Sequence, residues 1–321
     1  WFERASSINE DDSTMKTVTD LERRQTAWPF RKAVFLAAFL CSLYLTEGRS
    51  LAGPVSGTAL WLEADVGVGT DGSGNLTWQD QSGNGHNAAS PSIGNNPTFV
   101  NNAFATGKPT LRFDGAPQFL NITGQVLTNT QQYTVMAVVN DQRAAGDGNF
   151  REVFSNWSPT NTTTSVFLGT ANTNPVRARF TDDMGGATDP INTQTGVGAI
   201  TNPSDHFIFS GESTGTDGFV FQNASLIAQK GSPISPRDVN VNDGLYRVGT
   251  QGGFELWQGD IAELLVYDRA LTSSEFQQNL DYLDAKYFAP SSVPEPASLA
   301  LLGFGGLGLL GYGWRRRRTV A

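Results

Sequence analysis

The chain has 321 residues, with 22 Lys and Arg against 31 Asp and Glu, which gives a formal net charge of −9. The acidic excess is concentrated in residues 53–290, which hold 11 basic and 23 acidic side chains, whereas the two ends together are net basic. Because phosphate backbones are bound by Lys and Arg, this composition argues against nucleic acid as a partner. An acidic segment rich in Gly, Asn, Thr and Ser is typical of a turn-rich β protein that works outside a cell.

Residues 1–52 are predicted to be an N-terminal extension that ends in a signal peptide. A basic Arg-Lys pair precedes the apolar run AVFLAAFLCSLYL at residues 33–45, and small residues after this run favour cleavage after Ala52. The run is too short to span a bilayer, and a buried core helix is the alternative interpretation. The single cysteine, Cys41, lies in this run, so the following segment has no disulfide and no cysteine-based metal site.

Residues 53–290 are predicted to form one β domain. Short β-like runs are separated by clusters of Gly, Asn, Asp and Ser, and this spacing favours a sandwich of two sheets. The run at 132–140 is apolar on both faces, so we expect it in a fully buried layer, and Asn223-Ala224 is expected to form a hairpin turn. The predicted strands are 59–65, 75–80, 109–115, 132–140, 163–170, 206–213, 218–223, 225–230, 245–250 and 259–268.

One helix is predicted at the end of this domain. Thr272 and Glu275 have the spacing of a capping box, with Leu271 placed for a hydrophobic staple. Apolar residues then follow on one helical face, so the helix is expected to pack on the sandwich and to end before Pro290. This face consists of Phe276, Leu280, Leu283 and Tyr287.

The motifs LWLEADVGV, LTWQDQSGNGHNAA, PTLRFDG and GDIAELLVYDRALTSSEFQQNLDYLDAKY resemble those of bacterial laminin G-like domains of the concanavalin A-like class. The resemblance covers roughly residues 57–288. It implies an all-β fold, a jelly roll of two antiparallel sheets with a short C-terminal helix. Members of that class are mostly non-catalytic modules that bind carbohydrate or protein, often with a structural calcium ion.

The loop DQSGNGHN is the candidate calcium site. Carboxylate, hydroxyl and amide oxygens on a Gly-rich loop suit Ca²⁺, and the shorter DGSGN at 71–75 is similar. The alternative is a turn in which these side chains bond to the backbone. The proposed ligands are Asp80, Ser82, Asn84 and Asn87.

Exposed tryptophans are candidates for stacking on sugar rings. Trp157, in the loop SNWSPT, is the favoured one, and Trp257 is a further possibility. Trp61 and Trp78 lie in predicted strands and are expected in the core.

Glu63 and Asp65 are the candidate catalytic pair, because this fold also hosts glycoside hydrolases and lyases. A retaining hydrolase needs two carboxylates about 5–5.5 Å apart, and the i, i+2 spacing places both on one strand face. They lie where a strand runs into a turn, so the alternative is a pair of solvent-exposed carboxylates at an edge. Asp260 and Glu263 are three residues apart on a predicted strand, so they are expected to face opposite sides and to be structural.

The only two histidines, His86 and His206, give no further catalytic motif. His86 lies in a polar loop and His206 begins a predicted strand, and neither has a matched Ser or Asp motif that would complete a triad. The sequence contains no H-E-x-x-H, so it gives no support for zinc hydrolysis.

Residues 291–321 are predicted to be a sorting signal with a membrane helix. Residues 297–314 are 18 uncharged residues, long enough as a helix to cross a bilayer, and four arginines follow at 315–318. By the positive-inside rule these arginines stay in the cytoplasm, which places the β domain on the far side of the membrane. GFGGLG within the helix matches a dinucleotide fingerprint but lacks the βαβ context that this motif needs.

The complete tail resembles a PEP-CTERM sorting signal, since Val-Pro-Glu-Pro, an apolar helix and an arginine cluster occur in that order. The resemblance implies that an exosortase recognises Pro294, Glu295 and Pro296. It also implies cleavage near this motif and a bacterial host that makes exopolysaccharide.

Together these features predict an exported protein of the cell envelope or the extracellular space, anchored in the membrane transiently or permanently. Its predicted function is non-enzymatic binding of a glycan, an exopolysaccharide or the extracellular matrix. The alternatives are a polysaccharide hydrolase or lyase that uses Glu63 and Asp65, and a passive structural component of the matrix.

Overall fold

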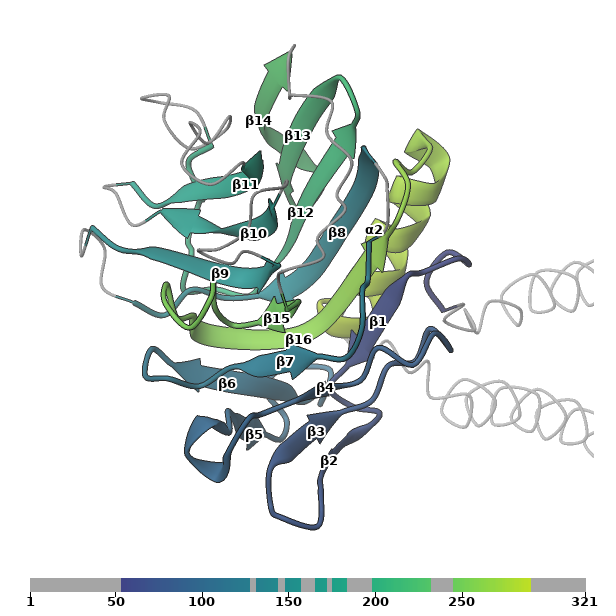
Figure 1. Cartoon of the computed structure of the whole chain (residues 1–321). Coiled ribbons are helices and arrows are strands. Elements are labelled where there is room, and N and C mark those ends of the chain that lie inside the picture. Colours follow the sequence, from purple (N-terminus) through teal and green to yellow (C-terminus); the bar gives the residue numbers. More distant parts are fainter. Residues whose placement is uncertain are drawn as a thin grey trace, which may run out of the picture. The chain divides into compact units, whose positions relative to one another are not determined.

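The computed structural model describes residues 53–127, 131–143, 148–156, 165–171, 175–183, 198–231 and 245–289. They form two antiparallel β-sheets and one α-helix, α2 (Ser273–Tyr287) (Figure 1). The predicted all-β class with two antiparallel sheets and a short C-terminal helix is confirmed, and each of the ten predicted strands is present. The jelly-roll designation stays a prediction.

The first sheet, sheet A, contains eight strands. They are β1 (Leu60–Glu63), β5 (Thr98–Val100), β6 (Thr110–Asp114), β8 (Gln132–Val139), β12 (Phe207–Thr214), β13 (Asp217–Gln222), β14 (Ser225–Gly231) and β16 (Gln258–Tyr267). Their order is β14-β13-β12-β8-β16-β6-β5, and β1 also pairs with β16. The long central strands β8 and β16 therefore form the middle of the sheet.

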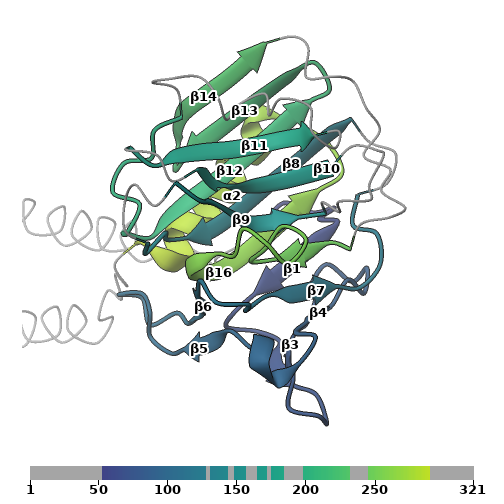
Figure 2. The same cartoon turned by 60° about the vertical axis from the view of Figure 1, so that its left-hand side comes forward.

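The second sheet, sheet B, also contains eight strands. They are β2 (Val68–Thr70), β3 (Leu76–Trp78), β4 (Ala88–Ala89), β7 (Leu120–Ile122), β9 (Phe150–Ser155), β10 (Ser165–Ala171), β11 (Arg177–Asp183) and β15 (Arg247–Val248). Their order is β11-β10-β9-β15-β7-β4-β3-β2, and a short 3-10 helix, η1 (Ile93–Asn95), follows β4. Figure 2 shows strands of sheet B in front of sheet A, with α2 on the far side of sheet A.

Sheet A is covered on both faces. Val135 and Val139 of β8 belong to the core between the two sheets, whereas Met136 and Val138 belong to a second core under α2. Two apolar faces on one strand predict a buried layer, and this prediction is confirmed. The helix is thus part of the core architecture, since without it one face of β8 and β16 would meet water.

Local signals at the helix and the hairpin are confirmed. The Thr272 side chain accepts a hydrogen bond from the Glu275 N–H, and the Glu275 side chain accepts one from the Thr272 N–H, which completes the capping box. The helix ends at Tyr287. Asn223, with φ of 54°, starts the two-residue turn between β13 and β14.

Replacing Thr272 by alanine is expected to lower the free energy of unfolding by about 1 kcal/mol, because the first turn of α2 loses its cap. Urea unfolding of the two proteins measures this difference. Ser274→Ala, at an exposed position in the same turn, is the control and is expected to change little. Equal effects of the two substitutions would contradict a capping role.

The start of the described chain is fastened to its last helix. The Val55 N–H donates to Asn279 Oδ1 of α2 at 2.8 Å, and the Tyr267 hydroxyl of β16 donates to the Val55 carbonyl at 2.9 Å. Within the described ranges no helix is both long and apolar enough to cross a membrane. The predicted signal peptide, the membrane helix at 297–314 and the basic tail at 315–318 lie outside the described residues.

Candidate functional site

The predicted calcium ligands lie in one loop, but the Asp80 carboxylate is already engaged. Its Oδ1 accepts hydrogen bonds from the backbone N–H groups of Trp61 and Ser82 at 3.0 and 2.9 Å. Its Oδ2 accepts the Ser82 hydroxyl at 2.7 Å and the His86 N–H at 2.9 Å. The Asn87 Oδ1 in turn accepts the N–H of Asp80 at 2.9 Å. These bonds are those of the turn alternative, in which side chains order the loop.

Asn84 joins this loop to the segment that precedes β1. Its amide nitrogen donates to the carbonyls of Thr58 and Ala59, both at 3.0 Å. Among the described residues no three His, Cys, Asp or Glu side chains gather as a metal-binding group. A cation at Asp80 would have to displace four donors, so this arrangement does not fit a calcium site. Calcium binding stays a prediction.

Glu63 and Asp65 are brought together, but the expected alternative of an exposed pair is wrong for Glu63, which is buried. Lys286 of α2 contacts both carboxylates, with its Nζ 2.8 Å from Glu63 Oε1 and 3.3 Å from Asp65 Oδ1. Asp65 also pairs with Lys108. The candidate catalytic pair is therefore neutralised by two lysines and covered by a helix.

Glu263 of β16 is the third carboxylate in this cluster. It pairs with Lys286 at 2.7 Å and accepts hydrogen bonds from the hydroxyls of Tyr282 and Tyr287 at 2.9 and 2.8 Å. The indole N–H of Trp61 donates to the same carboxylate at 2.8 Å. Every donor to Glu263 named here comes from β1 or α2, so this carboxylate joins three elements. We call Glu63, Asp65, Glu263 and Lys286 the lysine cluster.

The prediction that Asp260 and Glu263 face opposite sides is wrong. The pairing of β16 with β8 shifts between Ile261 and Glu263, where a β-bulge adds one residue. The extra residue returns Glu263 to the face of sheet A that α2 covers. Asp260 lies on that face too, since its Oδ2 is 3.0 Å from His206 Nε2. The His206 ring in turn contacts Phe104 of the core under α2, with 4.2 Å between the ring centres.

The two carboxylates of the candidate pair differ in their affinity for a proton. Burial, together with a hydrogen bond with Asp65, raises the pKa of Glu63 from 4.5 to about 7. Burial acts in the same direction on Asp65, but hydrogen bonds with Glu63 and Lys108 lower the pKa of Asp65 to about 2. Glu63 is therefore the carboxyl group of the pair that holds a proton at mildly acidic pH.

Glu63 makes stability depend on pH. Its folded-state pKa of about 7 lies above the ordinary value of 4.5, so its contribution is fully present below pH 4.5 and is lost as the pH rises through 7. We expect the free energy of unfolding to fall between pH 5 and pH 8, and Glu63→Gln to flatten this slope. Urea titrations of both proteins at several pH values test it. Since the two histidines are present in both proteins, equal slopes would contradict the assignment to Glu63.

The tryptophans divide as follows. Trp78 is fully buried, as predicted, and Trp61 is half-buried against the lysine cluster. The expectation that Trp257 is exposed is wrong, because this side chain is fully buried in the core between the sheets. Trp157 lies outside the described residues, as does the sorting motif Pro294, Glu295 and Pro296.

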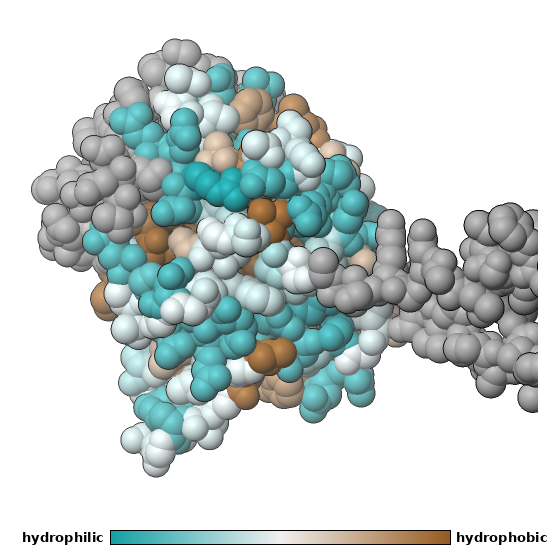
Figure 3. Space-filling model, turned by 90° about the vertical axis from the view of Figure 1, so that its right-hand side faces the viewer, coloured by the Kyte–Doolittle hydropathy of each residue, from teal (hydrophilic) through white to brown (hydrophobic). Residues whose placement is uncertain are grey.

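The side of the molecule on which α2 lies in Figure 1 is mainly hydrophilic, with hydrophobic residues in small separate groups (Figure 3).

A tight turn between β15 and β16 presents an exposed aromatic side chain. The Gln251 N–H donates to the Phe254 carbonyl at 2.9 Å, and the Phe254 N–H donates back to the Gln251 carbonyl at 2.8 Å. Gly252 and Gly253 between them have φ of 61° and 90°, which glycine adopts without steric penalty. The turn leaves Phe254 66% exposed.

Glu255 follows this turn in an unfavourable backbone conformation. Its φ is 51°, and a residue with a Cβ in this region costs on the order of 1 kcal/mol or more. Two contacts hold it there. Its carbonyl accepts the Glu152 N–H at 3.0 Å, and its Oε2 lies 2.7 Å from Arg179 Nη1. Strain of this kind often marks a functional position.

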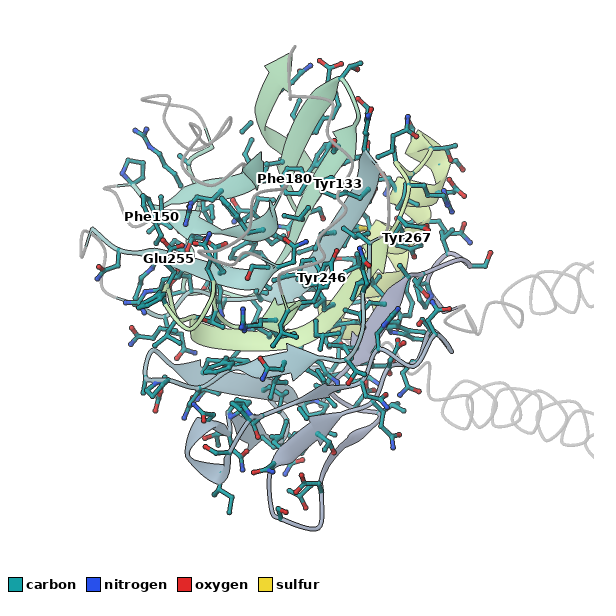
Figure 4. All side chains as sticks on the ribbon, in the orientation of Figure 1. Tyr133, Phe150, Phe180, Tyr246, Glu255 and Tyr267 are labelled. Carbon is teal, nitrogen blue, oxygen red and sulfur yellow. The ribbon has the colours of Figure 1, made fainter. Side chains whose placement is uncertain are left out.

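Arg179 of β11 links Glu255 to sheet B. Its guanidinium carbon lies 4.0 Å from the ring centre of Phe150 and 4.4 Å from that of Phe167, and it also pairs with Glu152. Phe150 is 39% exposed. Figure 4 shows Phe150 and Glu255 next to each other on the molecule. We call Phe150, Phe254 and Glu255 the turn surface.

Sequence reasoning missed the turn surface. The Gly-Gly pair is a sequence signal for a tight turn between strands. The approach of Arg179 to Glu255, which are 76 residues apart, has no local signal. It depends on the pairing of β9, β10 and β11.

The C-terminal tail matches a known family model, the PEP-CTERM protein-sorting motif, over residues 292–318. This confirms the predicted sorting signal and with it Pro294, Glu295 and Pro296 as part of the matched segment. A signal of this kind is recognised by an exosortase, so the protein is exported and associated with the envelope. No curated protein is similar enough in sequence to match the chain.

Solved structures resemble the chain in fold only. Trypanosoma rangeli sialidase aligns with a TM-score of 0.50 at 16% identity, over 80% of this chain and 38% of the sialidase. The binding domain of Paraclostridial Mosquitocidal Protein 1 aligns with a TM-score of 0.49 at 14% identity, over 70% of this chain and 52% of the binding domain's chain. Domain 4 of the arabinanase AbnA from Geobacillus stearothermophilus, solved with arabinotriose, aligns with a TM-score of 0.43 at 15% identity, over 71% of this chain and 98% of that domain. The chain thus spans well under two thirds of the length of the first two of these structures.

Proposed function

We propose that this protein is an exported, non-enzymatic β-sandwich that binds carbohydrate or extracellular matrix at the cell surface. The sorting motif at 292–318 accounts for the surface location. The laminin G-like resemblance supports carbohydrate or matrix as the ligand, with calcium as an accompanying hypothesis.

One observation carries the choice of binding over catalysis. The candidate acid pair Glu63 and Asp65 holds the ammonium of Lys286, whose side chain is 5% exposed under α2. A glycosidase needs its two carboxylates on either side of the scissile bond, in reach of substrate and water. Here the two carboxylates are hydrogen-bonded to each other and contact a buried lysine, which supports a role for the pair in the packing of α2.

The test is a glycan array and a polysaccharide panel, both with the mature exported protein and both with and without EDTA. We expect retention of a glycan and no release of reducing ends. Release of reducing ends would overturn the non-enzymatic assignment and favour the hydrolase or lyase. Absence of binding in both conditions would favour a passive structural component. Binding that is lost with EDTA would support calcium.

Sorting has its own test. Mass spectrometry of the mature protein is expected to find a C-terminus near Pro294–Pro296, without Trp314 and the four arginines that follow it. If these residues are still attached, exosortase processing is wrong and the tail is a plain membrane anchor.

A further inference from the structure

We propose that the turn surface (Phe150, Phe254 and Glu255) binds a neutral polysaccharide, with sugar rings against the two phenylalanines and sugar hydroxyls donating to the Glu255 carboxylate. The inference rests on the proposed function and names the site and the ligand class. It uses none of the residues that the sequence predicts as ligands.

The backbone of the turn and the Glu255 side chain are held in place before any ligand arrives. The Gln251–Phe254 turn is closed by two backbone hydrogen bonds, and Glu255 is held by Glu152 and Arg179. A side chain that is already ordered loses little conformational entropy on binding. The backbone strain at Glu255 is explained if this conformation is needed to direct its carboxylate.

The two phenylalanines provide apolar faces at the surface. Single exposed apolar side chains are common, but here one exposed phenylalanine directly precedes Glu255 in the chain and another shares Arg179 with it. Phe254 is contiguous with Glu255 in the chain, and Phe150 is connected to Glu255 through the guanidinium of Arg179. Sugar rings present C–H faces beside hydroxyl groups, so a ligand of this class matches both parts of the surface.

The charges favour a neutral sugar over an acidic one. The Arg179 side chain is almost fully buried and is shared by Glu152 and Glu255, so its charge is balanced within the protein. The Glu255 side chain is 24% exposed, and its carboxylate can accept hydrogen bonds, which sugar hydroxyls donate. Residues 53–290 hold 23 acidic against 11 basic side chains, and this field repels uronic acids and sulfated sugars.

The experiment compares binding of neutral and uronic-acid polysaccharides by the mature exported protein and three variants. Phe254→Ala is expected to weaken the affinity for the neutral glycan about tenfold, from the loss of one stacking face. Glu255→Gln is expected to weaken it by a similar factor. The matched control is Phe99→Ala, because Phe99 is 40% exposed but lies on β5 of sheet A. It is expected to bind as the wild type does. Thermal unfolding of each variant checks that the fold is retained.

The outcomes separate the site from the function. If the wild type binds a neutral glycan and Phe254→Ala and Glu255→Gln bind equally well, the site is wrong while the proposed function stands. Tighter binding of uronic acids than of neutral sugars would overturn the ligand class. If the wild type binds no glycan, the proposed function fails and this inference fails with it.

Discussion

Replacing Lys286 by methionine is expected to lower the free energy of unfolding by about 3–5 kcal/mol, the effect of removing one partner from a buried ion pair. The lysine side chain is 5% exposed and lies 2.7 Å from Glu263 and 2.8 Å from Glu63. Methionine keeps most of the length and the apolar contacts of the lysine stem. The substitution therefore isolates the charge, and it leaves the carboxylates buried without their cation.

Urea unfolding at pH 8 measures the effect, because Glu63 is then largely ionised and needs its partner most. Lys108→Met is the matched control. Lys108 pairs with Asp65, but its side chain is 33% exposed, so its loss is expected to change stability by about 1 kcal/mol or less. If the two substitutions lower the free energy of unfolding equally, the burial of Lys286 does not make its ion pairs contribute more to stability than that of the exposed Lys108.

Replacing Gly169 by alanine is expected to lower the free energy of unfolding by about 2–3 kcal/mol. Glu152, Gly169 and Arg179 lie directly opposite one another on β9, β10 and β11. A Cβ on Gly169 would lie 2.0 Å from Glu152 Oε2 and 2.2 Å from the carbonyl oxygen of Arg151. The missing side chain on the middle strand is what lets the carboxylate and the guanidinium meet across it.

Because the second clash is with backbone, β9 and β10 must separate to accept the methyl group. The control is Gly72→Ala, where a Cβ meets nothing within 4 Å, and we expect a change of less than about 1 kcal/mol. Thermal unfolding of both variants tests the difference. A Gly169→Ala protein as stable as Gly72→Ala would show that sheet B tolerates a side chain at this position.

Local patterns in the sequence predict the fold well. Apolar runs bounded by turn residues predict ten of the strands, and the capping residues Thr272 and Glu275 predict where α2 begins. The six missed strands are β2, β4, β5, β7, β9 and β11. The first four have two or three residues, too few to show a period of two. β9 and β11 carry the buried charges Glu152 and Arg179, which pair with each other across β10, and a charged residue in a short run gives no sequence signal for a buried strand.

The candidate sites are much harder to predict. The i, i+2 spacing correctly brings Glu63 and Asp65 together, but it does not show that Lys286, more than 200 residues away, contacts both. The bulge in β16 is equally hidden, since one added residue reverses the face of every later side chain. The spacing of residues in the sequence predicts which side chains share one face of a strand. The partners of a buried charge depend instead on how distant segments pair.

The position of the lysine cluster has a mechanical consequence. The matched sorting motif begins at residue 292, shortly after α2 ends at Tyr287. If the protein is attached through this tail, a pull on the tail would reach the last turn of α2 first. That turn carries Lys286 and Tyr287, both bonded to Glu263 in the middle of sheet A. Peeling the helix away would uncover three carboxylates at once, and it would also release the start of the domain, since Val55 is bonded to Asn279. If the protein is held at the surface through its tail, as proposed, the load would first reach a turn that is bonded to the middle of sheet A.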